Sequence, residues 1–412
     1  MKILKLSSYF PPEQISSSHL TKDLNEAYLK AGFVFENYVP TPTRGVTKEV
    51  RNKYKKIKYE ELENGKIIIH RFSMFKEGKN PIQRAVRYAL VNFLQYKKGS
   101  RAQNVDLILS GSTPPTQGLL CGKVKKKLEK RYGHQVPFVY NLQDIFPDSL
   151  VNAKMTKKGS LIWKIGRKME DYTYRSADKI IVISEDCKQN IMAKGVPEEK
   201  IEVIYNWIDT DEVRPIDFAD NKLAEELKII DGKFRVVYAG NLGMAQGVEV
   251  LIDAARLLQE NENIEFLIFG KGVEEEKLKS KAAGLSNIRF LPFQPAERVS
   301  EVYSLGDCCV VMCKKGTGGA GVPSKTWSIM ACARPLVVSF DESELCDIVK
   351  KADAGLCSDS GDAKALSDNI LALSHNKQLA EAMGNNAREY AVRFAGKENA
   401  TSKYVELIKK TV

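Results

Sequence analysis

The chain has 412 residues, of which 43% are hydrophobic, 8% aromatic and 28% charged, which excludes a disordered chain, a collagen-like fibre and a disulfide-rich mini-protein. It has eight scattered cysteines without a CxxC pair and four histidines, so neither a disulfide scaffold nor a His/Cys zinc site is expected. The net charge of +11 is uneven, because residues 1–206 hold 37 Lys and Arg against 21 Asp and Glu, and the remainder holds 26 against 31. This asymmetry predicts two domains, of which the basic one lies near a membrane surface, a phosphorylated substrate or nucleic acid.

The first residues carry charge within a short apolar run and lack a cleavage site, so they do not predict a signal peptide. No uninterrupted apolar stretch approaches the ~20 residues that a membrane span needs. We therefore expect a cytoplasmic protein.

Short apolar segments, many of them continuous Ile, Val and Leu runs, alternate with amphipathic segments along both halves. Such runs are typical of parallel strands that are covered on both faces. In the first half the expected strands are Lys2–Leu6, Val34–Val39, Lys66–Phe72, Val105–Leu109, Pro137–Leu142, Lys179–Ile183 and Ile201–Ile204. In the second half they are Phe234–Tyr238, Ile264–Phe269, Ile288–Leu291, Cys308–Cys313, Pro335–Ser339 and Gly355–Cys357.

Helical spacing separates the expected strands. One apolar stripe from Leu20 to Ala31 predicts a helix that Gly32 caps, and another predicts a helix over 248–258. The alternation of strands and helices predicts two doubly wound α/β domains. We place them at 1–206 and 218–390, with a linker at 207–217 and, over 391–412, a C-terminal helix that could cross back to the first domain.

The loop Gly240–Gly247 follows an apolar strand and precedes a helix. Its glycines would let backbone amides approach a phosphate at the helix N-terminus. The GxGxxG spacing of a dinucleotide site is absent. A tight strand–helix turn without a ligand is the alternative.

The segment Lys315–Lys325 has four glycines within six residues, which suits a mobile loop or one that approaches a ligand closely. We expect a helix over 324–333 with Ser324 as its N-cap. Lys325 would then lie in the first turn, where a cation opposes the helix dipole at a cost of a few tenths of a kcal/mol. An anion bound beside Lys325 would explain this misfit, so we expect a diphosphate site; a flexible surface loop is the alternative.

Two segments of the first half also combine suitable side chains. Ser16, Ser17, Ser18 and His19 lie between the first strand and the first helix, where they could hold a phosphate or sugar or simply cap the helix. Asp144 follows the strand Pro137–Leu142 and could act as a general base or accept a sugar hydroxyl. A capping or turn aspartate is the alternative for Asp144.

Two other patterns favour structural roles. Asp209 and Asp211 have the DxD spacing of metal-binding sugar transferases, but they fall in the expected linker. The basic run Lys123–Arg131 has Val124 and Leu128 at helical spacing, which indicates the solvated face of an amphipathic helix and, secondarily, a membrane-surface patch.

Taken together, phrases along the whole chain resemble glycosyltransferase family 4, a retaining family with the GT-B fold. The nearest branch is similar to bacterial enzymes that build capsule and O-antigen repeats, including N-acetyl-L-fucosamine transferases. The matching phrases are Ser8–Glu13, Gln143–Pro147, Ala177–Ser184, Ile204–Asp209, Tyr238–Gly243 with Gln246 and Gly247, and Val322–Lys325 followed by Met330.

The resemblance implies two Rossmann-like domains facing an interdomain cleft. It also implies transfer of an N-acetylated or deoxy-amino hexose from a nucleotide-diphosphate donor, with UDP expected, to a lipid-linked or oligosaccharide acceptor. No metal or other cofactor is expected, because Lys325 and backbone amides would stabilise the leaving diphosphate. The implied donor-binding residues are Gly240, Asn241, Gly243, Gln246, Gly270, Lys271, Ser324, Lys325 and Glu344; the implied acceptor-binding residues are Ser16, Ser17, Ser18 and His19; Lys325 and Asp144 are the catalytic candidates.

The chain departs from the family pattern at several places. Asn241 and Gln246 stand where many relatives have an Arg and a Lys for the donor diphosphate. Ala320 and Ser328 lie near the positions of two glutamates, and Asp144 belongs to a Gln-Asp pair that replaces a common histidine. These departures leave Lys325 as the outstanding cation, while Glu344 resembles a residue near the donor sugar or ribose.

The acceptor is expected on the basic N-terminal domain, at the inner face of the cytoplasmic membrane. Anionic lipid could attract Lys123–Arg131, Lys154–Lys158 and Arg44–Lys58, at roughly 1 kcal/mol per well-placed charge. A GT-B nucleotide-sugar epimerase, which needs no acceptor, is one alternative function. A non-catalytic nucleic-acid-binding protein is the other; it would explain the basic half but not the diphosphate-like loops, so no nucleic acid is expected as a partner.

Overall fold

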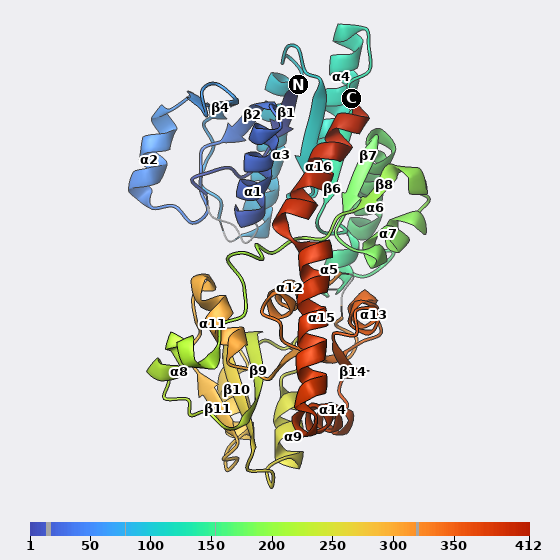
Figure 1. Ribbon diagram of the computed structural model, residues 1–412. Coiled ribbons are helices and arrows are strands. Elements are labelled where there is room, and N and C mark those ends of the chain that lie inside the picture. The colour runs from blue at the N-terminus through green and yellow to red at the C-terminus, as the bar shows by residue number, and fades with distance from the viewer. Residues whose placement is uncertain (14–17, 79, 153, 319–320) are drawn as a thin grey trace. The chain divides into compact units, whose positions relative to one another are not determined.

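The computed structural model describes residues 1–13, 18–78, 80–152, 154–318 and 321–412. They form two compact units, Met1–Ile204 with Thr401–Val412, and Tyr205–Ala400. Each unit contains one sheet of predominantly or entirely parallel strands (Figure 1). The expectation of two α/β units is therefore confirmed. The segment 207–217 is part of the second unit, where the Trp207 side chain is buried.

The first sheet has the strand order β3-β4-β2-β1-β5-β6-β7-β8. All seven strands that the sequence predicted for this half are present, and the sheet is parallel except where β3 pairs with β4. The sequence did not predict β3, because this short edge strand is largely exposed and lacks an apolar run. The strands are β1 (Lys2–Leu6), β2 (Val34–Pro40), β3 (Tyr59–Leu62), β4 (Ile67–Phe72), β5 (Leu107–Gly111), β6 (Phe138–Leu142), β7 (Lys179–Val182) and β8 (Ile201–Val203).

Helices cover both faces of the first sheet. From β1 the chain continues to β2 on one side of the sheet, and from β5 it continues to β6 on the other side. Because both connections are right-handed, α1 (Ser18–Lys30) and α4 (Gln117–Tyr132) lie on opposite faces of the sheet. On the α4 face, α3 (Pro81–Gly99), α4 and α6 (Leu161–Ser176) pack as consecutive neighbours. The remaining helices of this part of the chain are α2 (Lys48–Lys56), α5 (Asp148–Asn152), α7 (Glu185–Met192) and the 3₁₀ turn η1 (Glu198–Lys200).

The last helix, α16 (Lys397–Thr411), begins later than the helix expected over 391–412, because residues 391–395 still belong to α15 (Lys377–Ala395). From Thr401 onward its residues belong to the first unit. Tyr404 and Ile408 are almost fully buried there, and the Tyr404 hydroxyl lies near that of Tyr28 on α1. The C-terminal residues therefore complete the core on the α1 face of the first sheet.

Helices α4 and α6 approach each other closely because α4 has two glycines one turn apart. A Cβ atom on Gly118 would lie 2.2 Å from Thr173 Cγ2, and one on Gly122 would lie 2.7 Å from Ser176 Cβ. Thr173 and Ser176 both belong to α6. Larger residues at these α4 positions would force the two helices apart.

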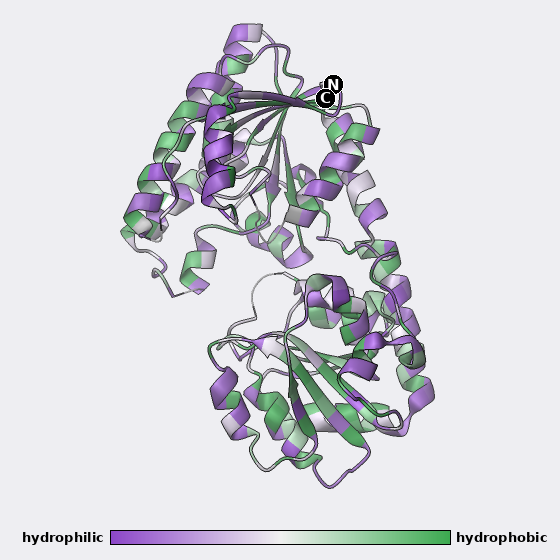
Figure 2. Ribbon diagram, turned by 90° about the vertical axis from the view of Figure 1, so that its left-hand side faces the viewer, coloured by the Kyte–Doolittle hydropathy of each residue, from purple (hydrophilic) through white to green (hydrophobic). Residues whose placement is uncertain are grey.

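The second sheet has the order β11-β10-β9-β12-β13-β14 and is parallel throughout. All six strands that the sequence predicted are present, and in Figure 2 they are mostly green, as expected for strands buried on both faces. The strands are β9 (Phe234–Asn241), β10 (Ile264–Lys271), β11 (Ile288–Leu291), β12 (Cys308–Met312), β13 (Leu336–Phe340) and β14 (Gly355–Asp359).

The helices of the second unit alternate with these strands. They are η2 (Phe218–Asp220), α8 (Lys222–Glu226), α9 (Glu249–Leu257), α10 (Glu275–Lys281), η3 (Ala296–Arg298), α11 (Val299–Ser304), α12 (Ser324–Ala331), α13 (Glu344–Lys351), α14 (Ala363–His375) and α15 (Lys377–Ala395). In the part of the chain that the structure describes, no helix is both long and apolar enough to cross a membrane.

The predicted N-cap of α12 is wrong. Pro323 occupies the N-cap position, and Ser324 is already the first helical residue, without a side-chain cap hydrogen bond. A residue with helical backbone angles no longer presents its hydroxyl to the free amides of the first turn in the way that a cap does. The first turn of α12 therefore keeps amides that its own side chains do not cap.

Candidate functional site

The order of the second sheet reverses between β9 and β12. The chain proceeds from β9 to β10 and β11 on one side, and from β12 to β13 and β14 on the other. Loops that follow the two central strands diverge at such a point, and ligands of doubly wound sheets bind there, beyond the carboxyl ends of the strands. The loop 240–247 follows β9 and the loop beginning at Cys313 follows β12, so both segments singled out from the sequence lie at this switch point.

The two loops are hydrogen-bonded to each other. The carbonyl oxygen of Ala245 accepts from the backbone amide of Lys314 and from Oγ1 of Thr317, both at 2.8 Å. Thr317 Oγ1 also lies 2.6 Å from the Lys314 carbonyl oxygen. These contacts fix the β12 loop against the β9 loop.

A carboxylate on a third strand end orders the glycine-rich loop. Oδ2 of Asp341, directly after β13, accepts from the backbone amides of Gly316 at 2.8 Å and Gly318 at 3.0 Å. A Cβ atom on Gly318 would lie only 3.0 Å from that oxygen. The sequence analysis missed Asp341, although an aspartate immediately after a buried apolar run was a visible signal.

Glycines at the strand ends allow backbones to approach closely. A Cβ atom on Gly270 would lie 2.3 Å from the Gly240 carbonyl oxygen, and one on Gly272 would lie 2.2 Å from the Leu242 carbonyl oxygen. Lys271, between these glycines, has an exposed side chain. The absence of side chains at Gly270 and Gly272 therefore allows the neighbouring backbones to pack this closely. The side chain of Lys271, between them, remains accessible to solvent.

Lys325, in the first turn of α12, reaches back to the end of β9. Its Nζ lies 4.2 Å from the centre of the Tyr238 ring, and a Cβ atom on Gly240 would lie only 2.7 Å from Nζ. Gly240 has φ +153°, a conformation that glycine adopts more readily than other residues. Burial removes water from the ammonium group and lowers the pKa of Lys325 to about 8.

Two amide side chains line the start of the β9 loop. Asn241 Nδ2 donates to Gln246 Oε1 across 3.4 Å, and a Cβ atom on Gly243 would meet both groups within 3.0 Å. Asn241 is exposed and Gln246 is partly buried. The structure therefore brings together Gly240, Gly243, Asn241 and Gln246.

Glu344 begins α13 and is buried. It accepts a hydrogen bond from the hydroxyl of Tyr205, whose ring centre lies 5.3 Å from that of Trp327 on α12. Tyr205 thus connects the helix that starts with Glu344 to the helix that carries Lys325. Tyr205 belongs to one of the phrases that carried the family resemblance, but the sequence analysis gave it no role.

The switch point of the first sheet lies between β1 and β5. Ser112, just after β5, accepts at Oγ from the backbone amide of Gln143, at 3.0 Å. The hydroxyl of Ser8, after β1, lies 3.2 Å from Oε1 of Gln117 at the start of α4. Asp144 follows β6 and its side chain is exposed. Asp144 is thus accessible to a ligand, beside a loop that Ser112 and Gln143 hold in place.

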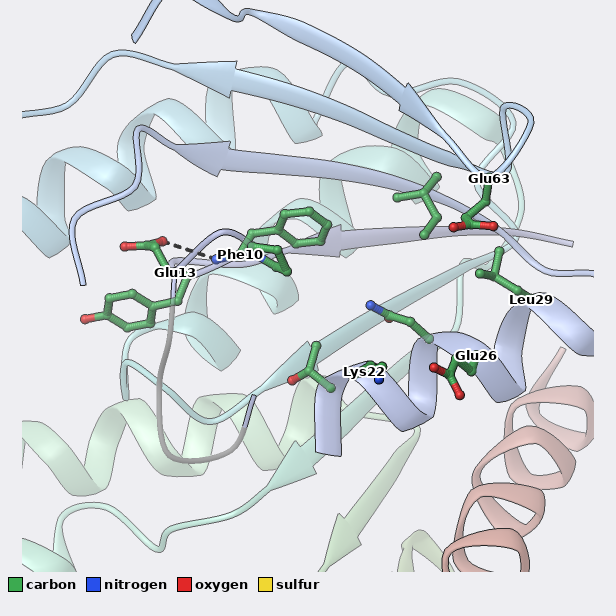
Figure 3. Close-up of a pocket in the computed structure, with 11 residues that line it drawn as sticks. Phe10, Glu13, Lys22, Glu26, Leu29 and Glu63 are labelled. Atoms are coloured by element: carbon green, nitrogen blue, oxygen red, sulfur yellow. Dashed lines mark hydrogen bonds between the residues drawn. The ribbon is translucent and has the colours of Figure 1, made fainter. Parts of the chain in front are cut away.

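Two of the four expected acceptor-binding residues lie at the start of α1. Ser16 and Ser17 lie outside the described residues, Ser18 is the first residue of α1, and His19 is exposed. A pocket of about 300 Å³ is lined by Lys22 and Glu26 of α1 and by Phe10 and Glu13 of the loop after β1 (Figure 3). His19 is not among the residues that line this pocket.

Asp209 has a structural role. Its Oδ1 accepts from the backbone amides of Asp211 at 3.1 Å and Glu212 at 3.2 Å, and its Oδ2 lies 3.1 Å from Lys397 Nζ. Among the residues that the structure describes, no group of three His, Cys, Asp or Glu is arranged to hold a metal ion. The DxD spacing is therefore explained by a turn and an ion pair.

Comparisons with known proteins agree with this architecture. Residues 49–212 match the family described as Glycosyltransferase Family 4, and residues 220–390 match Glycosyl transferases group 1. The chain is 27% identical over 304 residues to WcaI of Escherichia coli (strain K12), named as a candidate colanic acid biosynthesis glycosyl transferase; the match covers 71% of this chain and 72% of WcaI. It is 28% identical over 264 residues to a candidate glycosyltransferase, WbjE of Pseudomonas aeruginosa, covering 63% of this chain and slightly less than two thirds, 64%, of WbjE.

A solved structure extends the likeness in fold to the complete chain. HepE of Anabaena in complex with UDP superposes with a TM-score of 0.70 at 17% sequence identity, covering 100% of both chains. Residues 49–212 and 220–390 therefore form a family 4 and a group 1 glycosyltransferase domain, and the chain is a glycosyltransferase with the two-domain GT-B fold.

Proposed function

We propose that this enzyme transfers an N-acetylated or deoxy-amino hexose from a UDP-linked donor to a lipid-linked or oligosaccharide acceptor, with retention of the anomeric configuration. The reaction would be one step in the synthesis of a bacterial surface polysaccharide such as a capsule or O-antigen. The name of WcaI, which refers to colanic acid biosynthesis, supports the pathway class. The complex of HepE with UDP supports the donor class.

The observation that carries the proposal is the position of Lys325. Its ammonium lies against the backbone at Gly240, at the switch point between β9 and β12, and the amides at the start of α12 are not capped by side chains. Negative charge grows on the departing diphosphate as the glycosidic bond breaks. Fixed amides and a cation in a site with little water stabilise that charge strongly, because they need no reorganisation during the reaction.

The desolvated state of Lys325 also favours an anionic ligand. Without a partner, burial makes the charged form of Lys325 less favourable, which is why its pKa is lowered to about 8. A diphosphate beside Nζ would restore the charged form and gain the full attraction between the two groups. In this proposal the lysine and the amides replace a divalent metal.

The other donor contacts follow from the same arrangement. Asn241 and Gln246 would contact the donor through their amide groups, and Lys271 would lie near the nucleoside. Glu344, held by Tyr205, would face the ribose or the sugar. On the first unit, Asp144 would accept a hydrogen bond from the acceptor hydroxyl. The leaving phosphate would take the proton of that hydroxyl. No protein nucleophile is needed in this scheme.

The experiment is a thermal-shift panel with UDP, GDP, CMP and dTDP, in the presence and absence of EDTA. A nucleotide at 100 times its dissociation constant adds about 2.7 kcal/mol to the stability of the unit that binds it. For a unit of roughly 200 residues we expect a rise of about 5–10 °C with UDP, unchanged by EDTA. Loss of the shift with EDTA would contradict metal independence, and a shift with another nucleotide alone would contradict the UDP assignment.

Transfer itself is tested with UDP-sugars and a lipid-linked acceptor extract. NMR of the product anomeric proton would show the same configuration as in the donor. Inverted product would contradict the retaining reaction. Conversion of the donor into an epimer without an acceptor would instead identify an epimerase.

A further inference from the structure

Two cysteines of the second unit lie in contact at one edge of its sheet. Cys346 belongs to the first turn of α13, and Cys357 belongs to β14, the edge strand on which α13 packs. Sγ of Cys357 lies 4.0 Å from the carbonyl oxygen of Cys346, and the two thiols share a side-chain hydrogen bond. Packing of the helix on the strand therefore brings together two sulfur atoms whose residues are 11 positions apart in the chain.

This pair is more accessible than the other thiols. Seven of the eight cysteines are buried, and Cys357 is partly exposed. Cys346 is 8% exposed, whereas Cys308 and Cys309, on the inner strand β12, are completely buried. A small reagent can therefore reach the pair at Cys357, from the edge of the sheet.

The shared hydrogen bond also makes one thiol of the pair easier to ionise. The contact with Cys357 lowers the pKa of Cys346 to about 7, although burial opposes this shift. Among the neighbouring charges, Lys350 favours the thiolate of Cys346 and Asp347 disfavours it. The pKa of Cys357 moves upward, since this residue keeps the shared proton. The thiolate is the form of cysteine that reacts with oxidants.

The segment that carries Cys346 also carries two groups of the candidate donor site. Glu344, a proposed donor contact, lies two residues before Cys346 in the same helical turn. Sγ of Cys346 lies 4.0 Å from the carbonyl oxygen of Asp341, whose carboxylate orders the glycine-rich loop. The backbone amide of Asp341 in turn donates to Sγ of Cys313 across 3.5 Å. A movement of Cys346 would therefore be felt at both donor-site residues.

We propose that Cys346 and Cys357 are a site of reversible oxidation, in which a peroxide converts the two thiols into a disulfide and thereby weakens binding of the nucleotide donor. In a reducing compartment a disulfide of this kind is transient and serves redox sensing. The effect on the donor rests on the proposed function, whereas formation of the disulfide does not.

The reaction balances with hydrogen peroxide as the oxidant. The thiolate of Cys346 attacks one peroxide oxygen, the O–O bond breaks, and Cys346 becomes a sulfenic acid while hydroxide leaves. The thiol of Cys357 then attacks this sulfur, the S–O bond breaks, and the disulfide forms while water leaves with the thiol proton. The two sulfur atoms together lose two electrons, which the peroxide gains. A thiol reductant reverses the oxidation by exchange.

Formation of the disulfide would move the first turn of α13. The two sulfur atoms must come within about 2.05 Å of each other, which is a bonding distance rather than a hydrogen-bonding one. Cys346 would be drawn toward β14, and Glu344 would move with the same turn. Because protein interiors are closely packed, the hydrogen bond between Tyr205 and Glu344 would change as well. The oxidised chain should therefore bind the donor less tightly.

The first test counts thiols and locates the bond. After treatment of the folded chain with hydrogen peroxide, we expect two of the eight thiols to be lost in a titration under denaturing conditions, and dithiothreitol to restore them. Trypsin cleaves after Lys350 and Lys351, between the two cysteines, so the disulfide would join two peptides whose fragmentation identifies the bonded residues. Retention of all eight thiols, or a disulfide between other cysteines, would overturn the proposal.

The second test compares UDP binding by the reduced and the oxidised chain in calorimetry. Oxidation should weaken UDP binding at least about fivefold, the lower end of typical coupling between two sites, and dithiothreitol should restore it. A disulfide that leaves UDP affinity unchanged would overturn the regulatory role. If the reduced chain does not bind UDP, the proposed function and the effect on the donor both fail, while the thiol count still decides whether the disulfide forms.

Matched variants assign the roles of the cysteines. Cys357→Ser should bind UDP equally well before and after peroxide treatment, and it should leave a sulfenic acid on Cys346 that dimedone traps. Cys346→Ser should form neither product. The control is Cys313→Ser, which removes the third thiol near Asp341 and should still form the disulfide. Each variant is compared with its own reduced form, and circular dichroism shows that it is folded.

The control and the partly exposed position keep the test decisive. A disulfide lost in Cys313→Ser, or dimedone labelling of Cys357→Ser at a cysteine other than Cys346, would contradict the assignment. If Cys346→Ser does not fold, Cys357→Ser still separates the two outcomes, because its side chain is partly exposed.

Discussion

Lys325 and Gly240 show how single residues build the candidate donor site. The sequence analysis could not explain the position of Lys325 by local structure, because a positive charge in the first turn of a helix opposes the helix dipole. The structure gives its surroundings: the Tyr238 ring beneath Nζ and the backbone of Gly240 beside it. The sequence could identify the cation, but the contact with β9 depends on packing between segments some eighty residues apart.

Lys325→Ala should reduce turnover by roughly 10²–10³, because one preorganised group that stabilises the developing charge is lost. The variant should keep its circular dichroism spectrum. Lys315→Ala, which removes an exposed lysine of the same segment, is the control and should have a small effect. Near-wild-type turnover of Lys325→Ala would refute its assigned role.

UDP affinity should fall as pH rises through about 8, the lowered pKa of Lys325, because the neutral amine no longer attracts the diphosphate. The decline should approach tenfold per pH unit and be absent in Lys325→Met, as measured by calorimetry from pH 7 to 10. Stability without ligand should move in the opposite direction. Between about 8 and the ordinary pKa of 10.5 the unfolded state binds more protons than the folded state, so folding stability rises with pH.

Gly240→Ala should weaken UDP binding by about tenfold or more, because the new methyl group would displace Nζ of Lys325 and the backbone angle is unfavourable for alanine. Gly284→Ala is the matched control. Gly284 also has a positive φ, of +85°, but a Cβ atom there has nothing within 4 Å. Equal UDP affinities of the two variants would show that the space beside Lys325 is not critical.

At the scale of elements, sequence patterns predicted the buried strands well and the edges poorly. Apolar runs identified every parallel strand, because burial on both faces leaves a continuous signal. β3 was missed because an exposed edge strand has no such run. The N-cap of α12 was also assigned wrongly, since a serine before an apolar segment does not reveal whether its own backbone is already helical.

The packing of α4 on α6 provides a prediction at this scale. Gly118→Ala should destabilise the first unit by about 1–3 kcal/mol, because the methyl group would overlap Thr173. Urea unfolding monitored by circular dichroism measures this change. The double variant G118A/T173A should lose less stability than the sum of the two single variants, since Thr173→Ala removes the atoms that the methyl group meets; strict additivity would contradict the contact.

At the scale of the whole chain, the C-terminal residues belong to the first unit although they follow the second. Ile408→Ala should destabilise the first unit by about 2–5 kcal/mol, because this side chain is fully buried. UDP binding to the second unit should remain. The control is Val412→Ala, at an exposed position, and calorimetry with and without UDP distinguishes the transitions. A loss of stability confined to the unit that UDP stabilises would contradict this assignment.

The sequence by itself determined the class of fold, the two α/β halves, the excess of positive charge in the first half and the loops that carry glycines and Lys325. These features are local: apolar periodicity, composition and short spacings record them directly. The tertiary structure decided how Asp341 orders the glycine-rich loop and how Tyr205 holds Glu344. Those relations join residues far apart in the chain, and no local pattern encodes a contact whose two partners are positioned by separate elements.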